Sequence, residues 1–170
     1  MIKHIVLILM ILAFGLNVKA QDASKGNFGF GIGLDYGGFG TRFTYLPTPT
    51  IGLFGAFGYN LASLGYNFGA QFKLPSKTRA TGYFTGMYGY NGVLVVSGSI
   101  NSKTTYYGPT IGGGIELNSR KNEKNFWSFE LLIPFRDAQF QKDIDALKSI
   151  GASVSSPLPI AISVGYHIKF

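Results

Sequence analysis

Large apolar side chains alternate with small or polar ones along most of this chain, and the pattern is clearest at its end. From Ile160 to Phe170, apolar side chains occupy the even positions, and small or polar ones occupy the odd positions. Because successive side chains of a β-strand point to opposite faces, this segment predicts a strand with one apolar and one polar face.

The same alternation recurs upstream and predicts eight strands joined as an antiparallel meander. Glycine, proline, asparagine and serine separate the segments, as expected for turns. The expected strands are Phe28–Tyr36, Phe39–Tyr45, Ile51–Tyr59, Leu64–Leu74, Ala80–Tyr90, Thr105–Leu117, Phe126–Phe135 and Ile160–Phe170. The apolar run Val93–Val96 could extend the fifth strand beyond a barrel rim.

The N-terminus carries the pattern of a secretory signal peptide. Lys3 and His4 precede an apolar run that ends at Val18, and the small side chain of Ala20 suits a cleavage site. We therefore expect residues 1–20 to be removed and residues 21–170 to form one exported domain. The chain has no cysteine, which excludes disulfides and a lipid-modified cysteine.

Composition separates this domain from ordinary soluble proteins. Loss of Lys3 and Lys19 with the signal leaves 13 basic and 8 acidic residues, a net charge of +5. The excess is not clustered as in nucleic-acid-binding proteins, so no nucleic acid partner is expected. Charged residues make up 14% of the chain, against ~25% in a typical soluble domain. Few charges, 24 glycines and 15% aromatic residues suit strands that face lipid.

Two all-β architectures could use this alternation. A soluble barrel or sandwich turns its apolar face inward, whereas a membrane barrel turns it outward to lipid. The polar-face positions are mostly small, which suits the crowded interior of an eight-stranded barrel, and a water-facing sheet would carry more Lys and Glu. The pattern predicts an all-β, eight-stranded antiparallel up-and-down transmembrane β-barrel. A soluble periplasmic barrel that binds a small apolar ligand is the alternative.

Connection lengths predict the orientation of the barrel. The short turns would lie in the periplasm with both termini, and the long connections Asn91–Lys103 and Arg136–Pro159 would lie outside. Aromatic girdles would mark both rims. The expected members are Tyr45, Trp127 and Phe170 on the periplasmic side, and Tyr36, Tyr59, Tyr66 and Phe135 on the outer side.

One short amphipathic helix is expected in the connection before the last strand, at Asp137–Ile150. Phe140, Ile144 and Leu147 form an apolar stripe at helical spacing, and Asp137 and Gly151 are suited to its two caps. The helix could cover the outer mouth, lie on the outer leaflet or present its stripe to a partner. We favour the first position.

The polar positions place seven ionisable side chains inside the barrel. We expect a network of ion pairs and hydrogen bonds that fills the lumen, rather than a proton or ion path, because buried charges need partners and the bore is narrow. The expected members are Asp35, Arg42, Lys73, Glu116, Glu130, His167 and Lys169. No Ser–His spacing stands out and His167 is the only histidine after the signal, so no catalytic residue, metal site or cofactor is expected.

With these features, residues 21–170 resemble the small eight-stranded outer-membrane barrel proteins of Gram-negative bacteria, particularly those of Bacteroidetes-like organisms. The most specific element is the alternation of Val164, Tyr166, Ile168 and Phe170 to a final Phe. It resembles the signal that such proteins present to the barrel-assembly machinery. The resemblance implies a cell outer membrane location, with lipid and the assembly machinery as partners.

The functional hypothesis that follows is a non-enzymatic integral outer-membrane protein with a filled lumen. It would be structural, or would bind a protein partner through the loops Asn91–Lys103 and Arg136–Pro159. A small pore, or a component of an envelope transport or secretion assembly, is the alternative within the same class of fold.

Overall fold

The computed structural model of the protein describes residues 24–60, 62–96, 102–149 and 158–170. Each strand pairs antiparallel with its sequence neighbours, and β1 pairs with β8 to close a barrel. The strands are β1 Gly26–Gly33, β2 Gly38–Tyr45, β3 Ile51–Tyr59, β4 Leu64–Lys73, β5 Ala80–Val96, β6 Ser102–Asn118, β7 Asn125–Pro134 and β8 Ala161–Lys169. The helix α2 spans Ala138–Ser149. This confirms the predicted eight-stranded up-and-down barrel with one helix before the last strand.

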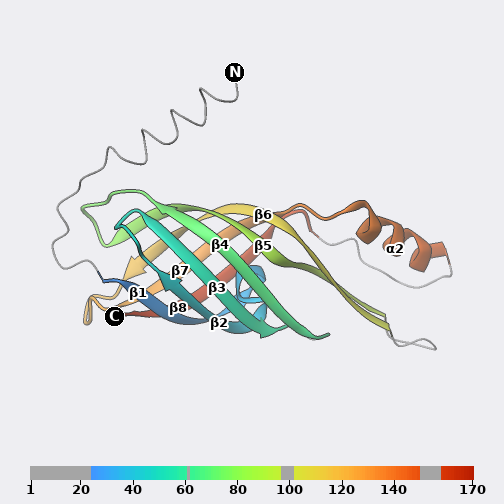
Figure 1. Cartoon of the computed structure of the whole chain (residues 1–170), viewed down its shortest axis with the longest axis horizontal. Coiled ribbons are helices and arrows are strands. Elements are labelled where there is room, and N and C mark those ends of the chain that lie inside the picture. Colours follow the sequence, from blue (N-terminus) through green and yellow to red (C-terminus); the bar gives the residue numbers. More distant parts are fainter. Residues whose placement is uncertain (1–23, 61, 97–101, 150–157) are drawn as a thin grey trace, which may run out of the picture.

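The two ends of the barrel differ in what they carry (Figure 1). One end holds Ser24, Phe170 and the turns that follow β2, β4 and β6, and we call it the termini end. From the opposite end, here called the helix end, α2 and the tips of β5 and β6 extend beyond the wall. The predicted signal peptide, residues 1–20, lies outside the described residues.

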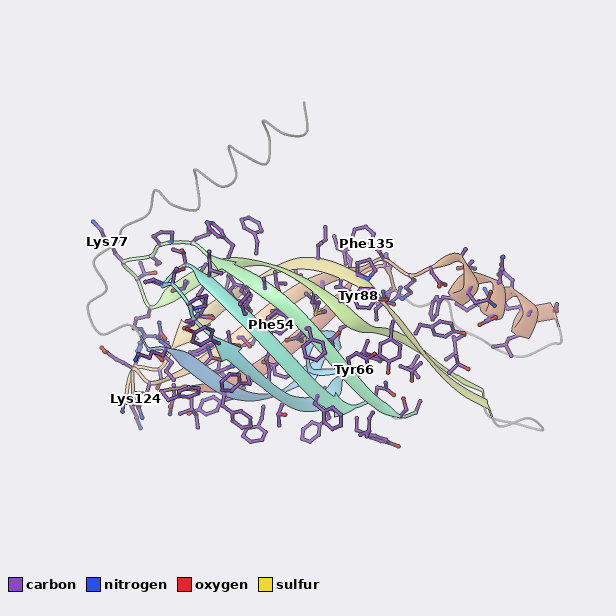
Figure 2. All side chains as sticks on the ribbon, viewed as in Figure 1. Phe54, Tyr66, Lys77, Tyr88, Lys124 and Phe135 are labelled. Atoms are coloured by element: carbon purple, nitrogen blue, oxygen red, sulfur yellow. The ribbon has the colours of Figure 1, made fainter. Side chains whose placement is uncertain are left out.

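Apolar side chains cover the outside of the barrel (Figure 2). Phe39 and Ile162 are each 70% exposed, whereas Arg42 is 2% exposed. The other expected girdle residues are exposed, but Tyr36 is fully buried. Burial is therefore inverted relative to a soluble β-protein, which turns its apolar face inward.

The first strand is shorter than its alternation predicts, and this corrects the position of Tyr36. The strand ends at Gly33, and Leu34–Tyr36 forms a 3₁₀ helix, η1, that folds into the lumen. Gly33 and Gly37 have φ angles of 143° and 70°, which side chains with a Cβ rarely adopt. The chain can therefore turn inward here, and Tyr36 lies inside the barrel instead of in the outer girdle.

The expected long loop Asn91–Lys103 is mostly strand. β5 continues to Val96 and β6 begins at Ser102, with a register shift between Tyr90 and Gly92. The run Val93–Val96 does extend its strand, as its composition suggested, and only residues 97–101 lie outside the described residues. The ends of β5 and β6 at this side pair only with each other and form a two-stranded extension. β4 pairs with β5 only as far as Gly89, and β7 pairs with β6 only from Thr110 onward.

Helix α2 packs against this extension rather than across the mouth of the barrel. Phe140 and Ile144 are buried against Leu94, and the Phe140 ring meets the Tyr106 ring edge-on at 4.8 Å. Leu147 joins the cluster at its edge. The apolar stripe is thus covered by the protein itself. Among the described residues, no helix combines the length and apolarity needed to cross a membrane.

Asp137 caps the helix as its position predicted. Its Oδ1 accepts hydrogen bonds from the backbone N–H of Gln139 (2.7 Å) and Phe140 (3.1 Å). These are donors that the first turn of a helix cannot satisfy internally. The expected C-terminal cap, Gly151, lies outside the described residues.

Candidate functional site

The lumen is filled in layers, which can be followed along β7. Inward side chains on this strand run from Phe126 near the termini end through Ser128 and Glu130 to Leu132. An aromatic layer, a hydrogen-bonded layer, an ionic layer and an apolar layer therefore follow one another. Leu132 belongs to the last of these, a cluster with Leu34, Phe54, Met87 and Tyr90.

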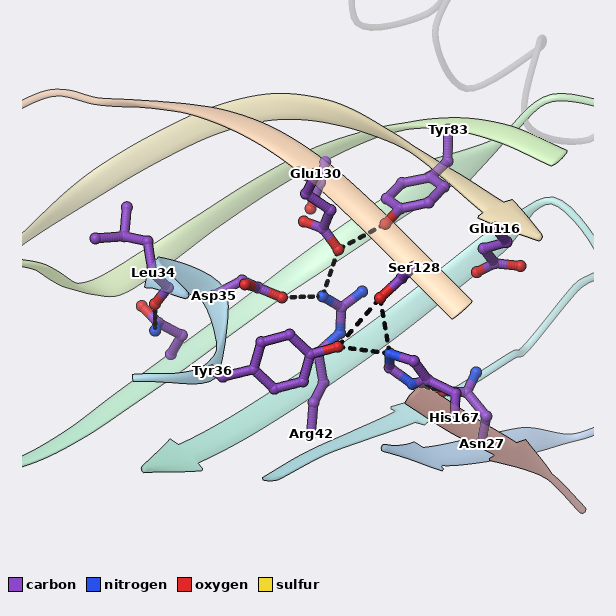
Figure 3. A network of polar contacts seen from close by, with 12 residues as sticks. Asn27, Leu34, Asp35, Tyr36, Arg42, Tyr83, Glu116, Ser128, Glu130 and His167 are labelled. Atoms are coloured by element: carbon purple, nitrogen blue, oxygen red, sulfur yellow. Dashed lines mark hydrogen bonds and ion pairs between the residues drawn. The ribbon is translucent and has the colours of Figure 1, made fainter. Parts of the chain in front are cut away.

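Arg42 is the centre of the ionic layer (Figure 3). Its Nη1 donates to Asp35 Oδ2 at 2.5 Å and to Glu130 Oε1 at 2.6 Å, and Glu130 also accepts from Tyr83 Oη at 2.6 Å. The guanidinium lies 4.3 Å from the centroid of the Phe54 ring. Each of these polar side chains is buried, so the ion pairs offset a desolvation cost of several kcal/mol per charge.

His167 organises the hydrogen-bonded layer. Tyr36 Oη lies 2.6 Å from His167 Nε2, and Ser128 Oγ lies 3.1 Å from the same atom. On the other side of the ring, Nδ1 lies 2.9 Å from Asn27 Oδ1, so a proton on Nδ1 donates to Asn27 and Nε2 accepts from a hydroxyl. The η1 helix is thereby tied to β1, β7 and β8.

The group Ser128, His167 and Asn27 has the residue types of a nucleophile, a base and an orienting amide. All three are at most 2% exposed, and Tyr36 Oη lies closer to Nε2 than Ser128 Oγ does. The arrangement orients side chains in a packed interior. No group of three or more His, Cys, Asp or Glu in the described residues could hold a metal ion.

Lys73, Glu116 and Lys169 lie nearer the termini end. Lys73 Nζ is 2.7 Å from Glu116 Oε1, and Lys169 Nζ donates to Asn118 Oδ1 at 2.5 Å. Both ammonium groups stand over the ring of Phe126, at 5.7 Å and 5.3 Å from its centroid. The Phe126 ring in turn stacks on His167 at 4.6 Å, which separates this region from the deeper layers.

A cavity of about 850 Å³ opens above these residues at the termini end. It is lined by Ser24, Leu46, Pro49, Lys73, Lys77, Thr78, Arg79, Thr81, Glu116, Asn118, Ser119, Arg120, Glu123, Lys124, Lys169 and Phe170. We call this cavity the cup. Its walls come from the turns, and its floor includes the Lys73–Glu116 ion pair.

Arg136 anchors the segment that leads into α2 at the helix end. Its Nη1 donates to the carbonyl of Leu158 at 3.0 Å, and its Nε donates to the carbonyl of Asn91 at 3.4 Å. Burial lowers the pKa of the Arg136 guanidinium from its ordinary value. Tyr106 Oη donates to Asp143, which fixes the helix to β6.

Six of the seven expected lumen residues are at most 7% exposed, and Lys169 is half-buried. They do not form one network: Asp35, Arg42 and Glu130 meet at the centre, and Lys73 and Glu116 pair near the cup. Of the expected assembly-signal residues, Val164, Tyr166 and Ile168 lie on the outward face of β8, and Tyr166 packs against Trp127. Phe170 follows the strand and is also exposed.

Sequence reasoning missed four members of the interior network: Asn27, Tyr36, Tyr83 and Ser128. The inward glycines carry a signal that could have found two of them. A Cβ on Gly165 would lie 1.8 Å from Tyr36 Oη, and one on Gly114 would lie 2.7 Å from Tyr83 Oη. Glycine at these positions makes the space that a large ring from elsewhere in the chain fills.

Comparison with known proteins shows a likeness in structure and none in sequence. No known family matches the chain, and no curated protein is similar to it in sequence. The structure is similar to the N-terminal β-barrel domain of Pseudomonas aeruginosa OprF, with a TM-score of 0.57 and 10% sequence identity. The match covers 85% of this chain and 96% of that one. At this identity the likeness shows the fold, an eight-stranded β-barrel.

Proposed function

We propose that this protein is an integral outer-membrane β-barrel with a closed lumen and a non-enzymatic role, as a structural or partner-binding element of the envelope. One observation carries the proposal: large apolar side chains are exposed on all eight strands, while the ion pairs of Arg42 are buried inside. Soluble monomers rarely expose apolar patches beyond a few hundred Å². A lipid solvent accounts for this surface.

The similarity to the OprF barrel domain supports the same proposal, since the fold is one that outer-membrane proteins use. The predicted signal peptide and the resemblance to Bacteroidetes-like barrels point the same way. The soluble alternative, a periplasmic carrier of an apolar ligand, is opposed by the exposed apolar face and by the ionic centre of the lumen.

The pore alternative is opposed by the packing of the lumen. Phe126 and His167 stack across the interior, and η1 fills the space beyond them. Tyr36, Leu132 and Arg42 all point into the lumen and are at most 2% exposed. An open bore along the barrel would leave such side chains exposed. Planar-bilayer recordings test this point: we expect no steady unitary conductance, and a reproducible one would contradict the closed lumen.

The membrane proposal is tested by placing a charge on the outer face. Phe129→Arg should lower the free energy of unfolding in lipid vesicles by about 2–4 kcal/mol, since Phe129 faces outward at the middle of β7. Leu158→Arg is the matched control, because Leu158 is 76% exposed and lies before β8; there we expect about 0–1 kcal/mol. Equal tolerance of both substitutions, or recovery of the protein in the soluble fraction without detergent, would overturn the proposal.

A further inference from the structure

The cup at the termini end carries an excess of positive charge. Its lining includes six cationic side chains, from Lys73, Lys77, Arg79, Arg120, Lys124 and Lys169, against the two carboxylates of Glu116 and Glu123. Lys77 and Lys124 are seen at this end in Figure 2. A volume of about 850 Å³ is within the ~300–1,000 Å³ of typical ligand sites.

Four of these cations have no partner within the protein. Lys73 is paired with Glu116, and Lys169 donates to Asn118. In contrast, the side chains of Lys77, Arg79, Arg120 and Lys124 make no ion pair or hydrogen bond with any described residue. Concentrating like charges around one cavity raises the free energy of the empty protein, and an anionic ligand would remove that cost.

The turns that carry these cations are joined and braced by hydrogen bonds to the backbone. The N–H of Asn118 donates to the carbonyl of Arg79 at 2.9 Å, which joins the turn after β4 to the turn after β6. Within the second turn, Ser119 N donates to Asn125 O at 2.8 Å and Lys124 N donates to Asn122 Oδ1 at 3.0 Å. The backbone of both turns is therefore held in place before a ligand arrives, which lowers part of the entropy cost of binding.

The opposite side of the cup is apolar. Around the closed barrel, Leu46 and Pro49 line the cup from the turn after β2. Phe170 is on the same side of the rim, and its ring faces outward, where it stacks on Phe43. The strand order places this half of the rim across from the turns after β4 and β6. The cup thus has most of its cations on one wall, and Leu46 and Pro49 on the opposite wall.

We propose that the cup binds an acidic peptide segment of a partner protein, one that carries apolar side chains between its carboxylates. The carboxylates would pair with Lys77, Arg79, Arg120 and Lys124, and the apolar side chains would pack on Leu46 and Pro49. A phosphate polyanion fits less well, because it cannot pack on these two apolar side chains and is repelled by Glu123. A peptide also brings N–H donors for Glu123.

This proposal goes beyond the membrane role and does not rest on it, because the purified barrel in neutral detergent presents the same cup. The probe is a synthetic hexapeptide that mixes Asp, Glu, Leu and Phe, labelled with a neutral dye and followed by fluorescence anisotropy. We expect saturable binding that weakens several-fold between about 50 mM and 300 mM salt, since these ion pairs are partly solvated. Absence of binding at low salt would overturn the proposal.

Two double variants with the same change in net charge separate a site from general attraction. Arg79→Gln with Arg120→Gln removes two lining cations, and we expect binding at least about tenfold weaker. Lys121→Gln with Lys142→Gln removes two cations that do not line the cup, and binding should stay within about twofold. Equal losses in both would mean attraction by net charge alone and would contradict a site. Heat-modifiable gel mobility checks that each variant is folded.

Two further probes decide the chemistry of the ligand. A hexapeptide with glycine in place of Leu and Phe should bind the natural protein more weakly than the mixed peptide does. In the Leu46→Ser variant, the affinities of the two peptides should be more nearly equal. Tripolyphosphate should compete poorly. If tripolyphosphate binds as tightly as the mixed peptide, or if the glycine peptide binds equally well, the cup is a site for anions in general and the peptide proposal is wrong.

Discussion

The two ends of this barrel place their charges differently. At the termini end, eight basic residues face two acidic ones: Lys25, Lys73, Lys77, Arg79, Arg120, Lys121, Lys124 and Lys169 against Glu116 and Glu123. At the helix end, the described side chains balance: Arg136, Lys142 and Lys148 against Asp137, Asp143 and Asp145. The net charge that looked dispersed along the sequence is gathered by the fold at one end.

The ends also differ in how their side chains are satisfied. At the helix end the lumen is filled by η1. Four charged groups of this end take part in a cap or in hydrogen bonds: Arg136, Asp137, Asp143 and Asp145. At the termini end several charges are left unpaired around an open cavity. Unpaired surface charges add little to stability, so their arrangement is better explained by binding than by folding.

The comparison is tested most strongly by removing a charge from the closed interior. Arg42→Met leaves Asp35 and Glu130 buried without a cation, and we expect a loss of about 3–5 kcal/mol in the free energy of unfolding. Urea unfolding in lipid vesicles measures it. Adding Asp35→Leu and Glu130→Leu to this variant should recover most of the loss, because no unpaired charge then remains.

Arg120→Met at the termini end is the matched control for that experiment. Its side chain lines the open cup and has no partner, so the free energy of unfolding should change by no more than about 0.5 kcal/mol. If Arg120→Met destabilises the barrel as much as Arg42→Met does, the cup is part of the stabilising packing and the contrast between the regions fails.

A smaller effect is expected where η1 meets the wall. Gly165→Ala would place a Cβ 1.8 Å from Tyr36 Oη, and the displaced ring would lose its hydrogen bond to His167. Overpacking of this kind costs about 1–3 kcal/mol, measured by the same urea unfolding. Gly86→Ala is the control, since a Cβ there meets nothing within 4 Å. An unchanged stability for Gly165→Ala would mean that η1 does not pack against β8 as described.

The alternation of side chains was enough to predict the barrel because each strand obeys one local rule. Ile51–Tyr59 was predicted to the residue, since a proline-rich turn precedes it and no competing pattern overlaps it. The rule failed at Leu34 and Tyr36, which have the right spacing for an outward face but lie after the backbone turns at Gly33. Alternation reports which side chains could share a face, but it does not report where the backbone leaves the sheet, as it does after Gly33.

The cup was harder to predict than the interior network. Inward positions on a strand can be read from spacing, so Asp35, Arg42 and Glu130 could be assigned to the lumen before their pairing was known. The cations of the cup come from two turns that are about forty residues apart, and turn residues follow no periodicity. Pairing of β5 with β6 brings the turns of Arg79 and Arg120 together, and closure of the barrel makes a cavity of the rim around them.

The smallest predicted effect concerns the helix end. Asp137→Ala removes the side chain that accepts from the N–H groups of Gln139 and Phe140, and should weaken α2 by about 1 kcal/mol. Because α2 lies outside the barrel wall, this loss should appear as faster amide exchange in the helix, with the urea midpoint of the barrel unchanged. Asp145→Ala, in the same helix away from its start, should alter exchange less. If instead Asp137→Ala lowered the urea midpoint, α2 and the barrel would unfold together. The helix would then not be the independent unit that its position outside the wall indicates.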